Sequence, residues 1–365
     1  MNAPARTFFA LPPAEAEARV EALGGRPFHA RIVRREAATR GVLDYARMTA
    51  LPAELRARLA AELPLVSARE VARRTAGDGT IKLLLSFPDE RTVETVWIPS
   101  RKPATGATLC VSTQVGCPVR CPFCASGKEG LVRNLEAHEI VEQYLFGRAL
   151  GALARSVVMG IGEPLLNLEN LSLALDFVRS EIGLGARKIT VSTVGFPERL
   201  ARAAARDPHF QLAISLHSPD DEQRWELVPA MRGVPVADVL AAGDRWFEET
   251  GREITYEYVL LGGTNDSPAH AARLAERLRG RRASVNLIPY NPIDEAGYGR
   301  PSAASAARFQ GILQEAGVVA TVRWSRGLEN DAACGQLRIR AGGLAAFPDG
   351  SLPTDSGEPV ERSHP

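Results

Sequence analysis

Long apolar runs, lysine and cysteine are all scarce in this chain of 365 residues. No apolar run approaches the roughly 20 residues that a membrane-spanning helix needs, and the start of the chain has no stretch that resembles a signal peptide. We therefore expect a cytoplasmic protein without a membrane partner. The net charge is only +1, so the overall charge gives no sign of a nucleic-acid partner. Nearly all of the positive charge is arginine, because lysine occurs only at Lys82, Lys102, Lys128 and Lys188.

Three of the five cysteines nevertheless fall within one short segment, QVGCPVRCPFCASG. Cys117, Cys121 and Cys124 could hold three irons of a cubane iron–sulfur cluster, which would leave one iron open. A structural zinc site would need a fourth Cys or His at ligand spacing, and the next His is His138, fourteen residues on. A disulfide framework is not expected in a chain of this length without a secretory signal.

This motif, with Phe123 between its last two cysteines, resembles the radical S-adenosylmethionine (SAM) superfamily. There, the open iron binds SAM and an electron from the cluster splits it. A lone cysteine is usually a small buried hydrophobe. However, TLCVSTQVGC around Cys110 and DAACGQL around Cys334 resemble the RlmN/Cfr family of radical SAM RNA methyltransferases over about residues 10 to 340. The resemblance implies a [4Fe–4S] cluster with three Cys ligands, and SAM, as cofactors.

Alternating elements predict an α/β fold. Apolar, β-branched segments alternate with helical stretches between residues 107 and 325, which indicates a parallel sheet with helices outside it. The segments are ATLCVST, SVVMGI, KITVST, QLAISL, ITYEYVL, ASVNLI and VATVRW. Six or seven strands, rather than eight, favour an incomplete (β/α)6-type radical SAM barrel. We expect this barrel to span 105–340 and a disordered tail to span 341–365.

Residues 1–75 predict a small helical accessory domain. Leu55, Leu59 and Leu63 repeat at helical spacing between Pro52 and Pro64, which would start and stop a helix. We interpret this part as the RNA-binding domain. An arginine cluster in it could contact phosphates, or could form a solvated helix face. Its members are Arg26, Arg31, Arg34, Arg35 and Arg40.

Residues 76–104 predict a β-hairpin linker, because TIKLLLSF and TVETVWIP alternate around the turn Pro88–Arg91. On such a strand Glu94 would share an otherwise apolar face with Val96 and Ile98. A desolvated carboxylate there suits a general base. In the alternative register, Glu94 would face solvent.

Polar residues follow several of the predicted strands, at the edge where ligands collect in parallel sheets. After the second strand, in MGIGEP, glycine permits a close backbone approach and a carboxylate can accept hydrogen bonds from a ligand ammonium. The resemblance implies that Gly162 and Glu163 bind the amino group of SAM. It implies that residues after the third, fourth and sixth strands contact the rest of SAM, although alone each would read as a local hydrogen-bonding residue. These are Ser192, Ser215, Leu216, His217 and Asn291.

The resemblance also implies the chemistry. Adenine C2 is an sp2 carbon without a usable lone pair, so direct SN2 transfer from SAM cannot reach it. In the family, the residue matching Cys334 carries the methyl group, the one matching Cys110 resolves the protein–RNA adduct through a transient disulfide, and the one matching Glu94 accepts the ring proton.

The implied substrate is C2 of adenosine in 23S ribosomal RNA, with tRNA as a further candidate. GEPLLN favours this C2-methylating branch. Two alternatives stay open: a Cfr-like C8 methyltransferase or a relative with another RNA target, and a zinc-containing RNA-binding module. We further expect a monomer and an electron donor such as flavodoxin or ferredoxin.

Overall fold

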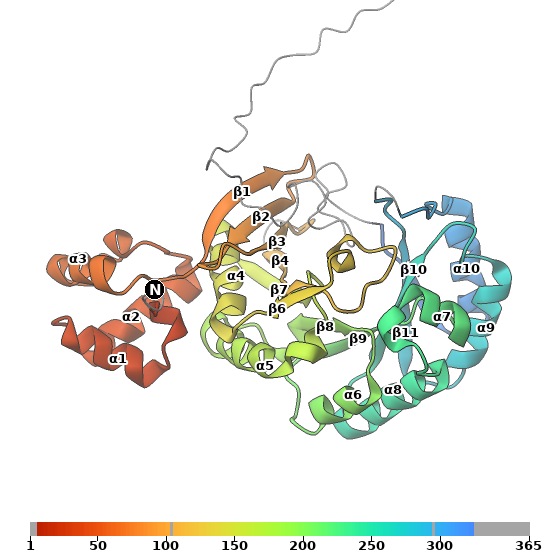
Figure 1. Ribbon diagram of the computed structural model, residues 1–365. Helices are drawn as coiled ribbons and strands as arrows, with labels where there is room; N and C mark the ends of the chain where they lie inside the picture. Colours follow the sequence, from red (N-terminus) through yellow and green to blue (C-terminus); the bar gives the residue numbers. More distant parts are fainter. Residues whose placement is uncertain (1–5, 103–104, 294–295, 325–365) are drawn as a thin grey trace, which may run out of the picture.

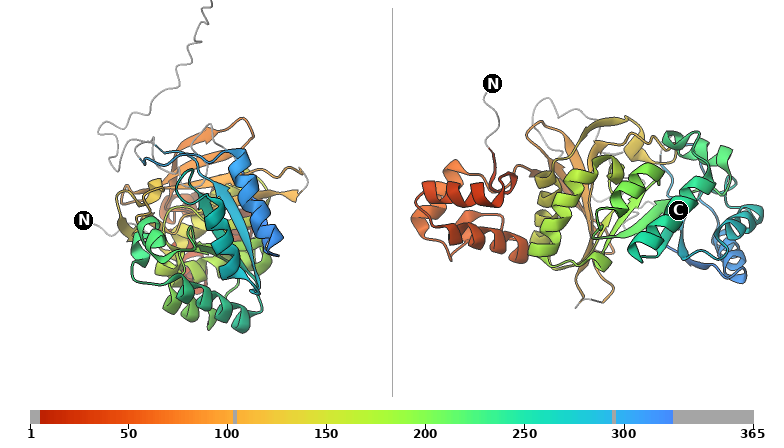
Figure 2. Two further views of the ribbon diagram at one scale, coloured as in Figure 1. Left: turned by 90° about the vertical axis from the view of Figure 1, so that its right-hand side faces the viewer. Right: turned by 90° about the horizontal axis from the view of Figure 1, so that it is seen from below.

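The computed structural model describes residues 6–102, 105–293 and 296–324. A helical unit lies at one end of a larger α/β unit (Figure 1). Its helices are α1 (Pro13–Ala22), α2 (Pro27–Arg40) and α3 (Ala53–Glu62), with 3-10 turns at Phe8–Ala10 and Tyr45–Arg47. Seen from below, this unit borders α4 and α5 of the larger unit (Figure 2).

Proline starts two of these helices. Pro13 and Pro27 occupy the first helical position, where the missing N–H costs nothing and the fixed φ favours the helix. The helix predicted between Pro52 and Pro64 is confirmed as α3, and its leucine stripe is buried.

The larger unit is built on one ten-stranded sheet of order β1-β2-β3-β4-β7-β8-β9-β10-β11-β12. The strands are β1 (Arg69–Thr75), β2 (Ile81–Ser86), β3 (Thr92–Ile98), β4 (Ala107–Cys110), β7 (Leu153–Val158), β8 (Ile189–Thr193), β9 (Gln211–Ser215), β10 (Ile254–Leu260), β11 (Ala283–Pro289) and β12 (Val319–Val322). From β4 onward all neighbours are parallel, and each of these strands matches a predicted segment.

Helices connect the parallel strands. They are α4 (Ala137–Leu150), α5 (Leu168–Phe177), α6 (Pro197–Ala204), α7 (Asp221–Leu227), α8 (Val236–Thr250), α9 (Pro268–Leu278) and α10 (Ala303–Glu315). Within the described residues β1 and β12 end the strand order and do not pair with each other, so the sheet stays open. The incomplete (β/α)6-type barrel is confirmed.

The hairpin is also confirmed, with a third strand added. β2 and β3 pair antiparallel around the predicted turn, and β3 joins the parallel part by pairing with β4. β1 pairs with β2, although its residues fall in the range we assigned to the helical domain. The sequence REVARRT is mostly polar, and the strand is mostly exposed, which explains why it gave no strand signal.

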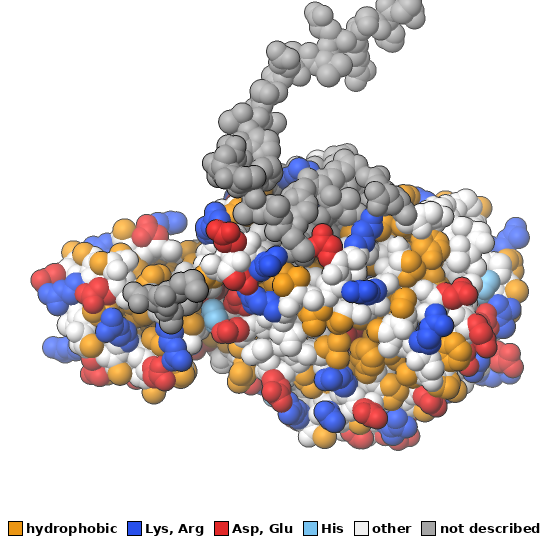
Figure 3. Space-filling view, viewed as in Figure 1, with side chains coloured by type: hydrophobic (Ala, Val, Ile, Leu, Met, Phe, Trp, Pro, Cys, Tyr) orange, Lys and Arg blue, Asp and Glu red, His pale blue; other side chains and the backbone are white. Residues whose placement is uncertain are grey.

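The arginines of α2 are largely engaged within the protein. Arg31 pairs with Glu17 at 3.1 Å and Arg40 with Glu36 at 3.0 Å. Arg34 lies over the rings of Phe8, Phe9 and Phe177 at 5.8–5.9 Å. On the face shown in Figure 3, acidic and basic side chains alternate over the helical unit. The predicted RNA-binding role of this unit stays a prediction.

No helix in the described ranges combines the length and the apolar character needed to cross a membrane. The predicted tail 341–365 lies outside the described residues.

Candidate active site

The three motif cysteines lie in a loop between two short strands, β5 (Gln114–Gly116) and β6 (Leu131–Asn134), which pair antiparallel. The Cys117 amide donates to the Gly130 carbonyl at 3.0 Å and closes the base of the loop. Gly130 leaves room for the Arg120 side chain, since a Cβ there would lie 2.7 Å from the guanidinium. Folded in this way, the loop brings all three cysteines to one cavity of about 160 Å³.

The chemistry of these thiols fits an iron–sulfur cluster. Burial raises the pKa of each thiol, to about 12 for Cys117. For Cys121 the charges of the two neighbouring thiolates raise the pKa further. Backbone N–H groups, such as that of Val119, donate to the sulfurs. Thiolates that repel one another in a buried site need a shared cationic centre, and N–H···S hydrogen bonds tune such centres.

Glu163 follows β7 and is fixed at the cavity wall. Its Oε1 accepts from the Thr193 hydroxyl at 2.6 Å and from the Leu165 amide at 3.1 Å, and Oε2 accepts from the Val194 amide at 2.9 Å. Burial raises the pKa of this carboxyl, although these hydrogen bonds oppose the effect. A carboxylate oxygen has two acceptor sites, so Oε2 can also receive a ligand donor.

Position 162 requires a glycine because the start of β5 passes close to its backbone. Its φ is 115°, and a Cβ would lie 2.7 Å from the Thr113 hydroxyl and 2.9 Å from the Gln114 amide nitrogen. The buried Gln114 side chain accepts from the Glu163 amide at 2.8 Å and donates to Asn134 at 2.8 Å. Gln114 therefore joins Glu163 to the sheet that bears the cysteine loop. Sequence reasoning missed it.

The polar strand ends converge as predicted. Ser192 and Ser215 close β8 and β9, and their hydroxyl oxygens lie 3.3 Å apart. Asn291 follows β11, and its Oδ1 accepts from Arg300 at 2.9 Å. All three line the same cavity as the cysteines and Glu163. That they bind SAM stays a prediction.

His217 is a buried, neutral ring with a left-handed backbone at φ 63°. Burial, helped by the charge of Arg224, lowers its pKa to about 3. Nδ1 accepts from the Val259 amide at 3.2 Å, so the neutral ring carries its proton on Nε2. Phe123 of the cysteine loop packs edge-on against this ring, with centroids 5.1 Å apart. The ring therefore joins the loop to the strand ends.

Leu216 differs from the other residues predicted to contact SAM, because its side chain does not face the cavity. It is fully buried in the core and does not line the cavity. Its amide donates to the Glu257 carbonyl at 3.0 Å, and its carbonyl accepts from Arg224 Nε at 3.1 Å. Leu216 therefore supports the cavity from behind.

Glu257 and Tyr290 are among the cavity residues that the sequence analysis missed. Glu257 on β10 accepts from Asn286 at 2.9 Å, and burial raises its pKa to about 6. Tyr290, just after β11, also lines the cavity. Glu257 could have been found from the alternation of ITYEYVL, where it is the only charged residue.

Glu94 is buried on the hairpin, as one of the two registers predicted. The expectation that the rest of its sheet face is apolar is wrong. Lys82 lies opposite Val96 in the register, and Lys82 Nζ is 3.1 Å from Glu94 Oε1. Cys110 lies opposite Val96 on the other side, in β4. The three strands thus place a buried ion pair on one face with the Cys110 thiol.

Cys110 is a free, partly buried thiol, and burial raises its pKa to about 12. Cys334 lies outside the described residues, so its meeting with Cys110 stays a prediction. Every cysteine in the described ranges is a free thiol, and the expected disulfide is not supported.

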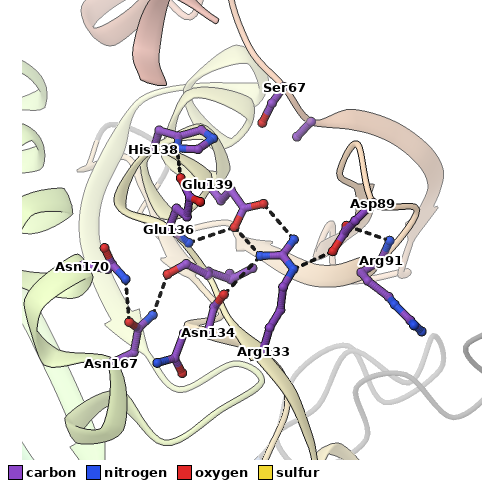
Figure 4. A network of polar contacts seen from close by, with 12 residues as sticks. Ser67, Asp89, Arg91, Arg133, Asn134, Glu136, His138, Glu139, Asn167 and Asn170 are labelled. Carbon is purple, nitrogen blue, oxygen red and sulfur yellow. Dashed lines mark hydrogen bonds and ion pairs between the residues drawn. The ribbon is translucent and has the colours of Figure 1, made fainter. Parts of the chain in front are cut away.

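Arg133 joins the hairpin turn to α4 (Figure 4). Its guanidinium makes two bonds to Glu139, at 2.7 and 2.8 Å, and one to Asp89 at 2.6 Å. Asp89 belongs to the hairpin turn and Glu139 to the first turn of α4. Since Arg133 lies on β6, opposite Val115, it fixes both elements to the small sheet.

His138, which the zinc alternative would have to recruit, lies elsewhere. Its Nδ1 is 3.3 Å from Glu136, and it lines a groove beside the helical unit rather than the cysteine cavity. Among the described residues, no group of three His, Cys, Asp or Glu side chains is arranged to hold a single metal ion.

Comparisons with known proteins agree with this geometry. Residues 111–275 match the family model described as the radical SAM superfamily. A protein of Rhodopirellula baltica named "Probable dual-specificity RNA methyltransferase RlmN" is 45% identical over 329 residues, 88% of either chain. A protein of the same name from Thermosynechococcus vestitus is 44% identical over 89% of this chain and 96% of that one.

A solved structure shares the fold. The crystal structure of a radical SAM methyltransferase from Sphaerobacter thermophilus superimposes with a TM-score of 0.85 at 43% identity, over 91% of this chain and 99% of that chain. The cysteine loop, the strand-end cavity and these similarities lead to one assignment: the chain belongs to the RlmN family of the radical SAM superfamily.

Proposed function

We propose that this protein is a radical SAM RNA methyltransferase that transfers a methyl-derived carbon from SAM to C2 of adenosine. Its candidate substrate is 23S ribosomal RNA, with tRNA as a second. The observation that carries the proposal is the single cavity shared by Cys117, Cys121, Cys124 and the polar strand ends. The names of the relatives, which describe dual-specificity RNA methyltransferases, support the RNA substrate.

The three cysteines would hold a [4Fe–4S] cluster and leave one iron open for SAM. When bound, the cluster supplies the electron that cleaves SAM to a carbon radical. The protein contributes acceptors and donors around it. Glu163 Oε2 would accept from the amino group of SAM, and Gly162 allows the backbone to approach it.

The remaining strand-end residues would orient the rest of SAM. The paired hydroxyls of Ser192 and Ser215 can donate to its carboxylate and ribose oxygens, and Asn291 can bind its polar adenine edge. His217 offers a neutral Nε2–H donor at all physiological pH values, since its pKa is about 3. Leu216 would act through its packing alone.

Three residues would act on the RNA base. Cys334 would carry the methyl group as S-methylcysteine, Cys110 would attack the bridging sulfur to release the product, and Glu94 would accept the ring proton. Cys110 and Glu94 share a sheet face, which supports their joint action. The ion pair with Lys82 keeps the Glu94 side chain in place on that face.

We infer a monomer that receives electrons from flavodoxin or ferredoxin. We also infer a cytoplasmic location, because an oxygen-sensitive cluster and free thiols suit a reducing compartment.

Mass spectrometry of RNA tests the function. Ribosomal RNA and tRNA from a strain that lacks the gene should lose 2-methyladenosine, and the wild-type gene should restore it. Loss of 8-methyladenosine instead would support the C8 alternative. An anaerobically reconstituted protein that contains zinc and no iron, with unchanged RNA modification in the deletion strain, would contradict the proposal.

A further inference from the structure

A fully buried arginine lies directly behind the candidate cavity. Arg224 on α7 donates through Nε to the Leu216 carbonyl at 3.1 Å, and through Nη2 to the carbonyls of Val194 at 2.6 Å and Ser215 at 3.2 Å. These carbonyls end β8 and β9, so the guanidinium bridges two strand ends. Val194 and Ser215 themselves line the cavity, whereas Arg224 does not.

The charge of Arg224 has no anion in hydrogen-bond contact. Its hydrogen-bond partners are neutral carbonyls, and within the described chain its Nη1 has no hydrogen-bond partner. The carboxylate of Asp221 raises the Arg224 pKa only through space, and its Oδ1 accepts from the Val236 amide. Burying an unpaired cation costs several kcal/mol, so a counter-charge is expected nearby.

The cysteine loop supplies the candidate anion. Cys121 lines the cavity together with Val194 and Ser215, whose carbonyls Arg224 binds. Because Arg224 is hydrogen-bonded to these two wall residues, its positive charge lies behind the backbone of the cavity that Cys121 lines. The same positive charge helps to keep His217 neutral.

We propose that Arg224 is the counter-cation of the cluster held by Cys117, Cys121 and Cys124, and that it raises the reduction potential of that cluster. The proposal rests on the proposed cluster. Reduction adds one negative charge to an anionic, thiolate-bound group, so a fixed buried cation stabilises the reduced form more than the oxidised form. Arg224 is therefore a positioning residue, which acts on the cluster through its charge and through the strand ends.

Two variants separate charge from hydrogen bonding. Arg224→Lys keeps the positive charge but loses the planar fork that bridges the carbonyls, whereas Arg224→Gln keeps an N–H donor and removes the charge. Arg273→Gln is the matched control, because Arg273 is an exposed arginine paired with Asp220 at 2.7 Å. Each full-length protein is reconstituted anaerobically, its iron content is measured, and its midpoint potential is determined by EPR-monitored titration.

We expect Arg224→Lys and Arg273→Gln to keep the wild-type midpoint. Arg224→Gln should have full iron but a lower potential, with at least a tenfold smaller reduced-to-oxidised ratio at a fixed potential. This change corresponds to about 59 mV for one electron. Circular dichroism confirms that each protein is folded.

Three results would overturn the proposal: a wild-type midpoint in Arg224→Gln, an equal fall in Arg224→Lys and Arg224→Gln, or an Arg224→Gln chain that does not fold. The first result would show that the charge of Arg224 does not affect the potential. The other two would show that Arg224 only holds the strand ends together through its hydrogen bonds. Failure of the wild-type protein to bind iron would instead contradict the cluster itself, so the two hypotheses fail in distinguishable ways.

Discussion

Replacing Glu142 by glutamine should change the pH dependence of stability. Glu142 lies on α4, fully buried, at the segment that joins the helical unit to β1. Its carboxylate accepts from the Ser67 amide and hydroxyl, both at 2.8 Å, and from the Ala68 amide at 2.7 Å. Two effects oppose each other here, because the hydrogen bonds favour the carboxylate while burial disfavours it.

Burial prevails and raises the pKa of Glu142 from 4.5 to about 7. Since the pKa is higher in the folded than in the unfolded state, the stabilisation that this group contributes is full below pH 4.5 and is lost as the pH rises through about 7. The whole difference corresponds to about 3 kcal/mol. Glutamine does not titrate, so Glu142→Gln should not share the loss with rising pH. Its absolute stability near pH 5 should lie below that of the wild type, because the glutamine NH2 cannot accept from the backbone amides of Ser67 or Ala68.

The assay is urea unfolding of both proteins at several pH values, because other titrating groups cancel in the difference between them. The variant should gain on the wild type by roughly 2–3 kcal/mol between about pH 5 and about pH 8. Glu315→Gln, at an exposed position, serves as the control. A difference that is constant with pH would show that the three hydrogen bonds cancel the effect of burial, and a wild type that gains on the variant as the pH rises would show that they outweigh it. Either result would refute the prediction.

Three further predictions concern the site. Cys121→Ala removes one of three iron ligands, so the iron content and SAM cleavage should both collapse; iron near four per chain would contradict the cluster. Cys110→Ala should accumulate a nuclease-sensitive protein–RNA adduct on denaturing gels, and adding Cys334→Ala should abolish it; normal turnover of Cys110→Ala would refute its resolving role. Arg133→Lys should loosen the hairpin turn, which native-state hydrogen exchange would detect as faster exchange around Asp89, with Arg206→Lys as an exposed control. Unchanged exchange there would refute that role.

Much of the fold could be predicted because strand and helix signals alternate. β4 and β7 to β12 carry short apolar, β-branched runs, and a parallel strand buried on both faces needs such a run. β1 could not be predicted in this way. It is an exposed edge strand with three arginines, and its stability comes from pairing with β2 rather than from burial.

The site likewise contains some residues that could be predicted from the sequence and others that could not. The strand-end rule brought Ser192, Ser215 and Asn291 together because the carboxyl ends of parallel strands meet at one edge. Gln114 and Arg224 escaped prediction, since Gln114 accepts from the Glu163 amide and Arg224 donates to the Val194 carbonyl, which are backbone groups of segments distant in the sequence. Contacts of this kind depend on the packed fold, and no local pattern encodes them.

The register between β2 and β3 determines which side chains surround Glu94. Alternation alone placed Glu94 on a face with Val96, but the pairing of β2 with β3 also puts Lys82 on that face, next to Glu94. Burial raises the pKa of the Cys110 thiol, opposite Val96, to about 12, which favours the protonated thiol at neutral pH. A thiol in that state is a poor nucleophile, so the resolving role proposed for Cys110 requires a base or a change in solvation when the adduct forms. The nearest buried charges on its face are Lys82 and Glu94, and the hairpin that carries them is fixed at its turn by Arg133. In the proposed mechanism, the hairpin therefore carries both the base that would accept the ring proton and the charged groups that share a face with Cys110.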